Sequence, residues 1–193
     1  MRFGRTVSGL LGVLWCAGIA ACVVFLRSDP DFRLRHPAVT ASAAITVAWM
    51  LLGWLGMALG LAIARAAWTL GWLMLLAHTA IAFGVAHGWS HAAAVEHVRE
   101  VGGTGAGIVV NYLFAAVWGA DVASWWYDPA GRANRPRWVA VAVHGFLLFV
   151  VLNATVVFGP PGRWWAYAAC LAALAVTWCI SGRPGARKRE RGR

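Results

Sequence analysis

The stretch AVTASAAITVAWMLLGWLGMALGLAIA, residues 38–64, contains no charged side chain from end to end. A continuous apolar run of about 18 or more residues is long enough to cross the hydrocarbon core of a bilayer as a helix. Lipid offers no hydrogen-bond partner to an open backbone, so only helices and closed barrels span membranes, and a run this long and this apolar predicts a helix. The stretch therefore indicates an integral membrane protein.

The rest of the chain repeats this pattern. The 193 residues are 61% hydrophobic and only 12% charged, and this charged fraction is about half of that usual in soluble domains. We predict an all-α, polytopic transmembrane bundle of about six spanning helices, which form a single domain over residues 1–182. The predicted spans are 7–26, 38–64, 68–88, 105–126, 138–158 and 163–181.

The first apolar run follows basic residues, as the core of a secretory signal does. It is longer than a usual signal core, and five more predicted spans follow it. We therefore expect an uncleaved first helix. Cleavage near the small residues AGIAA, at 17–21, is the alternative.

The distribution of basic residues predicts the orientation. If the N-terminus lies inside, most of the 17 Lys and Arg residues fall on inner segments, as cytoplasmic loops require. Both termini are therefore predicted to be cytoplasmic. Nearly all of these residues are arginine, a bias that suggests a GC-rich bacterial genome, and hence a multi-pass protein of the bacterial inner (cytoplasmic) membrane.

The C-terminal segment 183–193, RPGARKRERGR, is predicted to be a disordered cytoplasmic tail. Anionic lipid headgroups attract such a segment by about 1 kcal/mol per basic residue near the surface. The expected partners are thus the bilayer and its anionic headgroups. Nucleic acid is not expected, because the net charge of +10 is concentrated where membrane orientation signals belong.

Four of the six histidines lie within residues 77–98, AHTAIAFGVAHGWSHAAAVEHV. His87 and His91 have i,i+4 spacing, so a continuous helix would place both on one face, as two metal ligands from one helix require. If Gly88 instead ends the helix and Ser90 caps a short new one, His97 can fold back towards the pair. The three histidines His87, His91 and His97 are therefore predicted metal ligands near the outer end of the third span.

Glu96 and Glu100 are further candidates for ligands, or for residues that orient the histidines. This set of donors suits Zn²⁺, Cu²⁺ or non-haem iron. A bound metal could serve a membrane-bound oxidoreductase or hydrolase, or a sensor, so whether the chain is an enzyme is left open. The alternatives are a solvated rim of hydrogen-bonding histidines and a pH-sensing cluster. Haem is less expected, because His78 and His144 differ by about 8 Å in depth.

A second set of polar residues falls inside the predicted spans. An ionisable group at the centre of a membrane helix costs about 2.5–3.5 kcal/mol, so each one needs a partner, a cavity or a role. Depth pairs Asp121 with His144 and Asn111 with Asn153, with His78 between the two levels. The members of this predicted polar track are His78, Asn111, Asp121, His144 and Asn153.

Two interpretations of the track stay open. These side chains could form interhelical hydrogen bonds that only fix packing, as in a structural or assembly subunit. They could also line a proton or ion path built on Asp121, His144 and His78. The sequence shows no GxxxxGK[ST] phosphate loop, so a nucleotide-driven pump is unsupported.

Two smaller features concern packing and depth. Gly56 and Gly60 have the GxxxG spacing that lets helix backbones approach, and we expect packing within the chain, with a dimer contact as the alternative. Trp125, Trp126 and Trp138 bracket one predicted inner loop and are expected to lie at headgroup depth.

Overall fold

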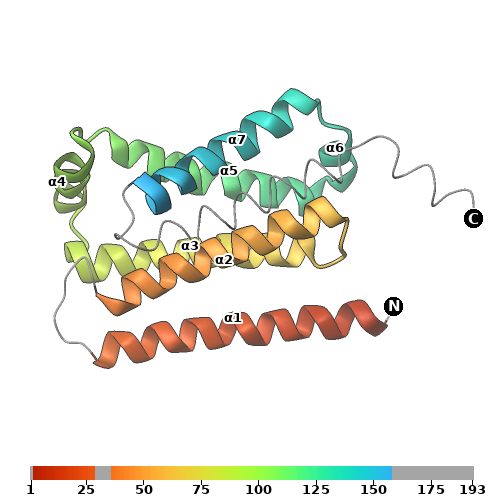
Figure 1. Ribbon diagram of the computed structural model, residues 1–193, viewed down its shortest axis with the longest axis horizontal. Coiled ribbons are helices and arrows are strands. Elements are labelled where there is room, and N and C mark those ends of the chain that lie inside the picture. Colours follow the sequence, from red (N-terminus) through yellow and green to blue (C-terminus); the bar gives the residue numbers. More distant parts are fainter. Residues whose placement is uncertain (1, 29–35, 158–193) are drawn as a thin grey trace, which may run out of the picture.

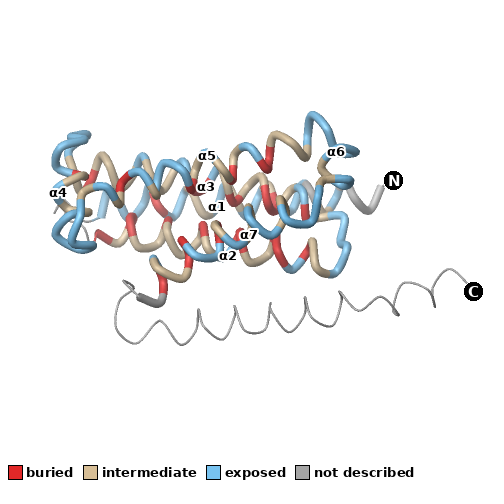
Figure 2. The backbone as a smooth tube through the Cα atoms, turned by 90° about the horizontal axis from the view of Figure 1, so that it is seen from above, coloured by how far each residue is buried: buried red, intermediate tan, exposed pale blue. Residues whose placement is uncertain are grey.

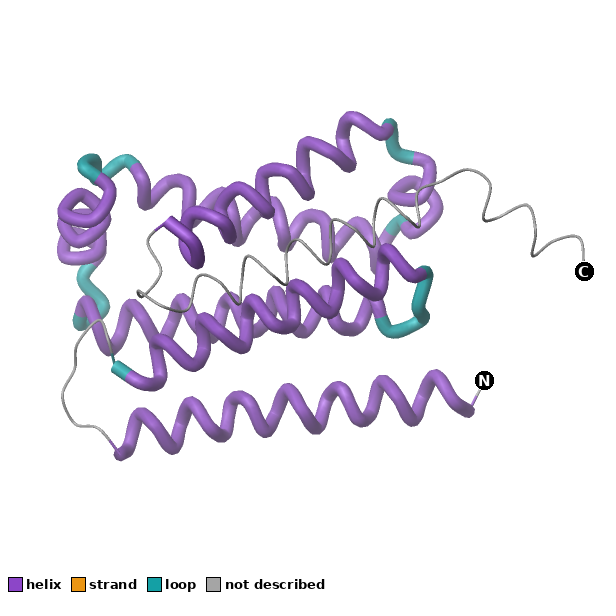
Figure 3. Tube along the Cα trace, in the orientation of Figure 1, coloured by secondary structure: helices purple, strands orange, loops and turns teal. Residues whose placement is uncertain are grey.

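The computed structural model describes residues 2–28 and 36–157. These residues form seven α-helices and one π-helical turn, with no strand among them (Figures 1 and 3). The elements are α1 (Arg2–Ser28), α2 (Pro37–Leu59), α3 (Ala64–His87), α4 (His91–Gly102), α5 (Gly107–Tyr127), α6 (Pro129–Asn134), α7 (Arg137–Leu152) and η1 (Asn153–Val157).

Five segments are long and apolar enough to cross a membrane, and they coincide with the first five predicted spans. They are Gly9–Ser28, Pro37–Leu59, Ala64–His87, Gly107–Tyr127 and Arg137–Thr155. The prediction of an all-helical chain with several long apolar helices is therefore confirmed for this part of the chain, and these helices are consistent with a membrane protein. The sixth predicted span, 163–181, and the tail, 183–193, lie outside the described residues, and the orientation of the bundle stays a prediction.

The two short helices lie at opposite ends of the bundle (Figure 1). Helix α4 connects α3 to α5 at one end, and α6 connects α5 to α7 at the other. We refer to these as the α4 end and the α6 end. The tight turn between α2 and α3 also lies at the α6 end (Figure 1).

That turn begins earlier than the sequence predicts. Residues 38–64 were expected to be one continuous span, but α2 ends at Leu59 because Gly60 adopts a left-handed conformation with φ of 67°, which glycine accepts without steric cost. Of the predicted GxxxG pair, only Gly56 is a packing residue. A Cβ atom on Gly56 would lie 3.0 Å from Cα of Ala64, so the close approach is between α2 and α3 of the same chain.

The main core is built around Trp68 of α3, which is fully buried. Its ring lies 5.8 Å from that of Trp54 on α2 and 4.9 Å from that of Trp118 on α5. Leu147 of α7 completes this cluster. Along α2, α3, α5 and α7, buried positions alternate with exposed ones (Figure 2), as expected when one face packs inward and the others are left to lipid.

Helix α1 packs on the outside of α2 and α3 through a second cluster that includes Leu11 and Cys22. Trp15 Nε1–H donates to the backbone carbonyl of Leu70 at 3.0 Å. A buried indole N–H needs such an acceptor. This contact therefore ties α1 to α3.

Helix α3 ends and α4 begins as the sequence predicts. Gly88 is left-handed, with φ of 54°, and ends α3. Ser90 then caps α4, because its side chain accepts a hydrogen bond from the N–H of Ala93 at 3.2 Å. The predicted break at Gly88 and cap at Ser90 are both confirmed.

Candidate functional site

An ionic cluster surrounds Asp121 of α5 at the α6 end. The carboxylate is buried, and both of its oxygens accept hydrogen bonds. Trp68 Nε1–H and Arg132 Nη2–H each donate to Oδ2 at 2.9 Å, and Arg135 Nη1–H donates to Oδ1. One donor from α3 and two from the α6 segment therefore converge on one carboxylate.

Local sequence explains how the two arginines return to Asp121. Asp128 caps α6 by accepting a hydrogen bond from the N–H of Gly131 at 2.8 Å, and Pro129 occupies the first turn, where its missing N–H costs nothing. A Cβ on Gly131 would lie 2.0 Å from Asp128 Oδ2, so any other residue at this position would displace the capping carboxylate. The resulting helix turns the chain back and carries Arg132 to the carboxylate.

The aromatic side chain of Trp125 also holds Arg132 in place. The guanidinium carbon lies 3.8 Å from the centroid of the Trp125 ring, a cation–π contact. The Nη2 group lies 3.6 Å from the sulfur of Met57 on α2. Arg132 Nε is buried and has no hydrogen-bond acceptor among the residues described. The carboxylate and the ring fix this guanidinium without using all of its donors.

The charges in the cluster do not cancel. Arg132 and Arg135 carry two positive charges and share the single negative charge of Asp121. Only 1% of the Asp121 side chain is exposed, against 12% and 17% for the two arginines. Burying the carboxylate requires cationic partners, and because two are supplied, the cluster keeps a net positive charge.

His144 of α7 extends the cluster. Its Nδ1 lies 3.2 Å from Trp54 Nε1, and its Nε2 lies 3.1 Å from Arg135 Nη2. Both neighbours are donors only, whereas a neutral imidazole has one accepting nitrogen. A neutral His144 can therefore accept a hydrogen bond from Trp54 or from Arg135, but not from both. The N–H group of the other residue needs a different acceptor.

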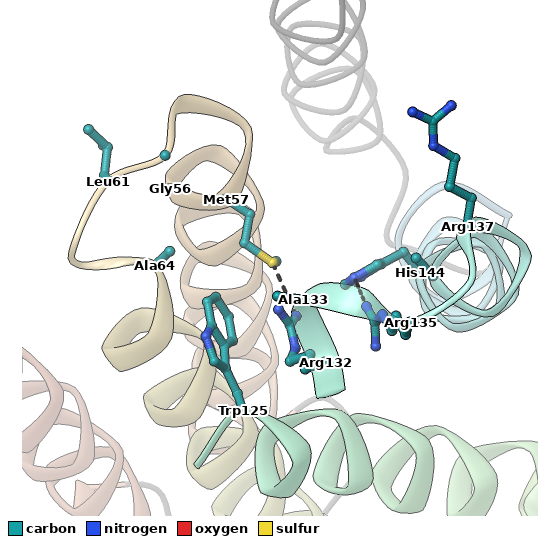
Figure 4. A pocket seen from close by; sticks show the side chains of 12 residues that line it. Gly56, Met57, Leu61, Ala64, Trp125, Arg132, Ala133, Arg135, Arg137 and His144 are labelled. Atoms are coloured by element: carbon teal, nitrogen blue, oxygen red, sulfur yellow. Dashed lines mark hydrogen bonds between the residues drawn. The ribbon is translucent and has the colours of Figure 1, made fainter. Parts of the chain in front are cut away.

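A pocket of about 570 Å³ opens beside this cluster (Figure 4). The turn between α2 and α3 supplies an apolar wall, and the segment from α6 into α7 supplies a cationic one. In Figure 4, His144 lies beside Arg135, whereas the side chain of Arg137 extends away from both. The lining residues are Gly56, Met57, Gly60, Leu61, Ala64, Trp125, Arg132, Ala133, Arg135, Arg137, Ala140 and His144. We call this the arginine pocket.

The structure brings together only part of the predicted polar track. Asp121 and His144 were expected at one depth, and they do belong to one cluster, with Arg135 in contact with both. The arginines entered the sequence analysis only as orientation signals, so their role in the site was missed. A signal was present, because a carboxylate inside a span needs a cation, and the connector that follows α5 is the nearest source of arginines.

The remaining polar-track residues have other surroundings. His78 Nδ1 lies 2.9 Å from Ser42 Oγ, a contact between α3 and α2. Asn153 donates to the carbonyl of Phe149 in its own helical segment at 2.8 Å, and Asn111 is exposed on α5. In the described part of the chain, no hydrogen bond joins His78, Asn111 and Asn153 to one another.

The predicted metal ligands at the α4 end are also divided. Because α3 ends at His87 and α4 begins at His91, these two residues do not share one continuous helical face, and of the two alternatives the break at Gly88 holds and the i,i+4 stacking of a continuous helix does not. His91 instead contacts the hydroxyl of Tyr112 on α5, with Nδ1 and the oxygen 2.8 Å apart. His97 does fold back to His87, as predicted, and their ring centroids are 5.5 Å apart.

The two glutamates at this end have local partners. Glu96 pairs with Arg99, and Oε2 of Glu100 lies 3.9 Å from Nδ1 of His97. Across residues 2–28 and 36–157, no group of three or more His, Cys, Asp or Glu side chains is close enough to hold a metal ion. The structure therefore offers two neighbouring histidines in place of the predicted cluster of three.

Comparison of the chain with protein-family models, curated proteins and solved structures finds no match.

Proposed function

We propose that this chain is a multi-pass membrane protein that binds an anionic ligand in the arginine pocket. One observation carries the proposal: two arginines share one buried carboxylate at the wall of a pocket of about 570 Å³. Asp121 thus holds the guanidinium groups in place without cancelling their charge. An anion that enters the pocket would meet cationic donors that are already oriented.

The chemistry of the donors supports this function. A guanidinium presents five N–H groups in a rigid plane, which suits carboxylate and phosphate oxygens. Asp121 and His144 account for only some of these groups on Arg132 and Arg135. The volume of the pocket lies within the range of small-molecule sites, about 300–1,000 Å³.

The predicted orientation places the pocket on the cytoplasmic side. The N-terminus of α1 lies at the same end of the bundle as α6 (Figure 1), and the excess of arginine on inner segments favours a cytoplasmic N-terminus. We propose a location in the bacterial inner membrane, where the pocket would receive an anion from the cytoplasm or from the inner leaflet.

Thermal unfolding of the purified protein in detergent tests the proposal. Phosphate, sulfate and acetate are the probes, because a ligand that binds only the folded state stabilises it by about 2.7 kcal/mol at 100 times its Kd. We expect at least one of these anions to raise the unfolding temperature. Arg135→Lys keeps the charge beside Asp121 but loses the planar fork, so it should reduce this shift. Stabilisation by none of the three anions would contradict an anion site.

A second candidate function is metal binding at the α4 end. The approach of His87 and His97 to 5.5 Å, with Glu100 beside His97, favours it. A metal held by the two histidines would leave its other coordination positions to water or to another ligand. Zinc, copper or iron are the metals that such donors suit.

Metal analysis of protein purified without chelators tests this second function. A stoichiometric metal should disappear in the His87→Ala, His97→Ala double variant. It should persist in His91→Ala, because His91 is directed to Tyr112 instead. A wild-type protein without metal, or equal loss in both variants, would refute the two-histidine site.

A further inference from the structure

The arginine pocket can be assigned a ligand class, on the premise that it binds an anion as proposed above. We infer that the group recognised is a phosphate ester, carried either by a membrane lipid or by a small soluble molecule. The charge of the site, its depth in the membrane and the composition of its walls all support this assignment.

Charge and geometry favour phosphate over carboxylate. The pocket is lined by Arg132, Arg135 and Arg137, and among the described residues Asp121, which pairs with the first two, is the one acidic partner of these arginines. A phosphate monoester carries about −1.5 to −2 charges at neutral pH and presents three strong acceptor oxygens. Tetrahedral oxygens can meet donors that approach from several directions, whereas a carboxylate offers two oxygens in one plane. The side chain of Arg137 extends away from that of Arg135 (Figure 4), so the donors of the pocket do not all approach from one direction.

Aromatic residues near the pocket indicate its depth in the bilayer. Exposed aromatic side chains gather at the same end of the bundle, and these residues prefer the headgroup region of a bilayer. Trp126 is 51% exposed, Tyr127 is 90% exposed and Trp138 is 73% exposed. They stand at the end of α5 and the start of α7, next to the arginines of the pocket. At this depth the phosphate esters of the lipids themselves are nearest, and basic pockets between membrane helices bind such headgroups.

The walls of the pocket fit an ester better than a bare anion. Met57, Leu61 and Ala64 form an apolar side opposite the cationic one. The volume of about 570 Å³ is far larger than a phosphate group needs. The organic part of an ester can therefore lie against the α2–α3 turn while the phosphate faces the guanidinium groups.

Titration of the full-length, delipidated protein in detergent tests the inference. The probes are dihexanoyl phosphatidic acid and glycerol 3-phosphate, which are both phosphate monoesters, and glycerate, which has a carboxylate in place of the phosphate. We expect the Kd of a phosphate ester to be at least about tenfold lower than that of glycerate, a difference of about 1.4 kcal/mol in binding free energy. Tighter binding of the lipid would identify a membrane ligand, and equal or tighter binding of glycerol 3-phosphate a soluble one. Either result supports the inference.

Other outcomes separate this inference from the proposed function. If glycerate binds as tightly as the phosphate esters, the ligand class is wrong and the anion site stands. If none of the probes binds, and phosphate, sulfate and acetate also fail to stabilise the protein, the proposed anion site is wrong as well.

Two exposed arginines at the α6 end provide a matched pair of variants. Arg137 lines the pocket and makes no ion pair among the described residues, so Arg137→Gln leaves the Asp121 cluster intact. Arg65 stacks on Trp126 at 4.2 Å and does not line the pocket. We expect Arg137→Gln to weaken binding about fivefold, the effect of one basic residue near a membrane surface, and Arg65→Gln to leave it unchanged. Equal effects of the two substitutions would mean diffuse charge attraction and would overturn the inference.

Discussion

The two ends of the bundle contain similar ionisable residues in different arrangements. At the α6 end, Asp121 pairs with arginines 11 and 14 positions away and with Trp68, which is 53 positions away. At the α4 end, Glu96 and Arg99 pair across one helical turn, with 50% and 61% of their side chains exposed. At the α6 end, ionic contacts to a buried carboxylate join separate helices. At the α4 end, the ion pair lies on the exposed surface of a single short helix.

This difference determines what each end can do. Buried charges interact strongly because little water screens them, and removing one partner leaves the others uncompensated. Exposed pairs are screened, and each contributes little. We therefore expect the α6 end to hold its cationic groups in a fixed arrangement, and the histidines of the α4 end to depend on helix geometry alone.

The largest expected effect is that of Asp121→Asn. This substitution leaves the part-buried side chains of Arg132 and Arg135 without their counter-charge, and breaking a pair with a buried carboxylate in this way costs about 3–5 kcal/mol. The free energy of unfolding in detergent should fall by that amount. A double variant with Arg135→Gln removes one uncompensated charge and should recover part of the loss. If Asp121→Asn unfolds at the wild-type temperature, the contrast between the two ends is wrong.

Packing at the two ends should respond differently to the same substitution. A Cβ on Gly53 would lie 2.7 Å from Cε3 of the fully buried Trp68, beside the arginine pocket. A Cβ on Gly84 would lie 3.1 Å from the ring of Trp89, which is 70% exposed and can move aside. Gly53→Ala should therefore cost about 1–3 kcal/mol by overpacking, and Gly84→Ala less than about 0.5 kcal/mol. Chemical unfolding of the two variants side by side measures both values, and equal losses would contradict the difference in rigidity.

Much of the fold could be predicted because long apolar runs in lipid allow few structures. The first five spans, the break at Gly88 and the cap at Ser90 all follow from hydropathy and from turn chemistry. The end of α2 was placed too late because Gly60 sits among apolar residues, and hydropathy does not detect a left-handed turn.

The candidate site was harder to predict, because its parts come from five helices, α2, α3, α5, α6 and α7. Depth alone put Asp121 and His144 together. It could not reveal that Arg132 folds back through α6, since that return depends on the Asp128 cap and on Gly131. At the α4 end, the spacing of His87 and His91 suggested one helical face, and the break between the helices removed it.

The helix caps give a matched test of intermediate size. Asp128→Ala and Ser90→Ala each remove one capping hydrogen bond, at a cost of about 0.5–2 kcal/mol. Asp128→Ala should also weaken anion binding, because α6 carries Arg132. Ser90→Ala should leave anion binding unchanged and affect only the approach of His87 and His97. Titration of both variants with phosphate checks this, and equal weakening would show that the ends are coupled.

The smallest expected effect is that of Glu96→Gln. Arg99 is exposed, and the carboxylate of Glu96 raises the pKa of this side chain, which is already charged at any ordinary pH. Since solvent screens the pair, its loss should not change the unfolding temperature measurably. Thermal unfolding at low and at high salt provides the check, because a structural ion pair would make the variant differ from wild type at low salt only. A clear difference between the unfolding temperatures of the variant and the wild type at low salt would mean that ionic interactions stabilise α4 as they stabilise the α6 end, and would contradict the proposed difference between the two ends.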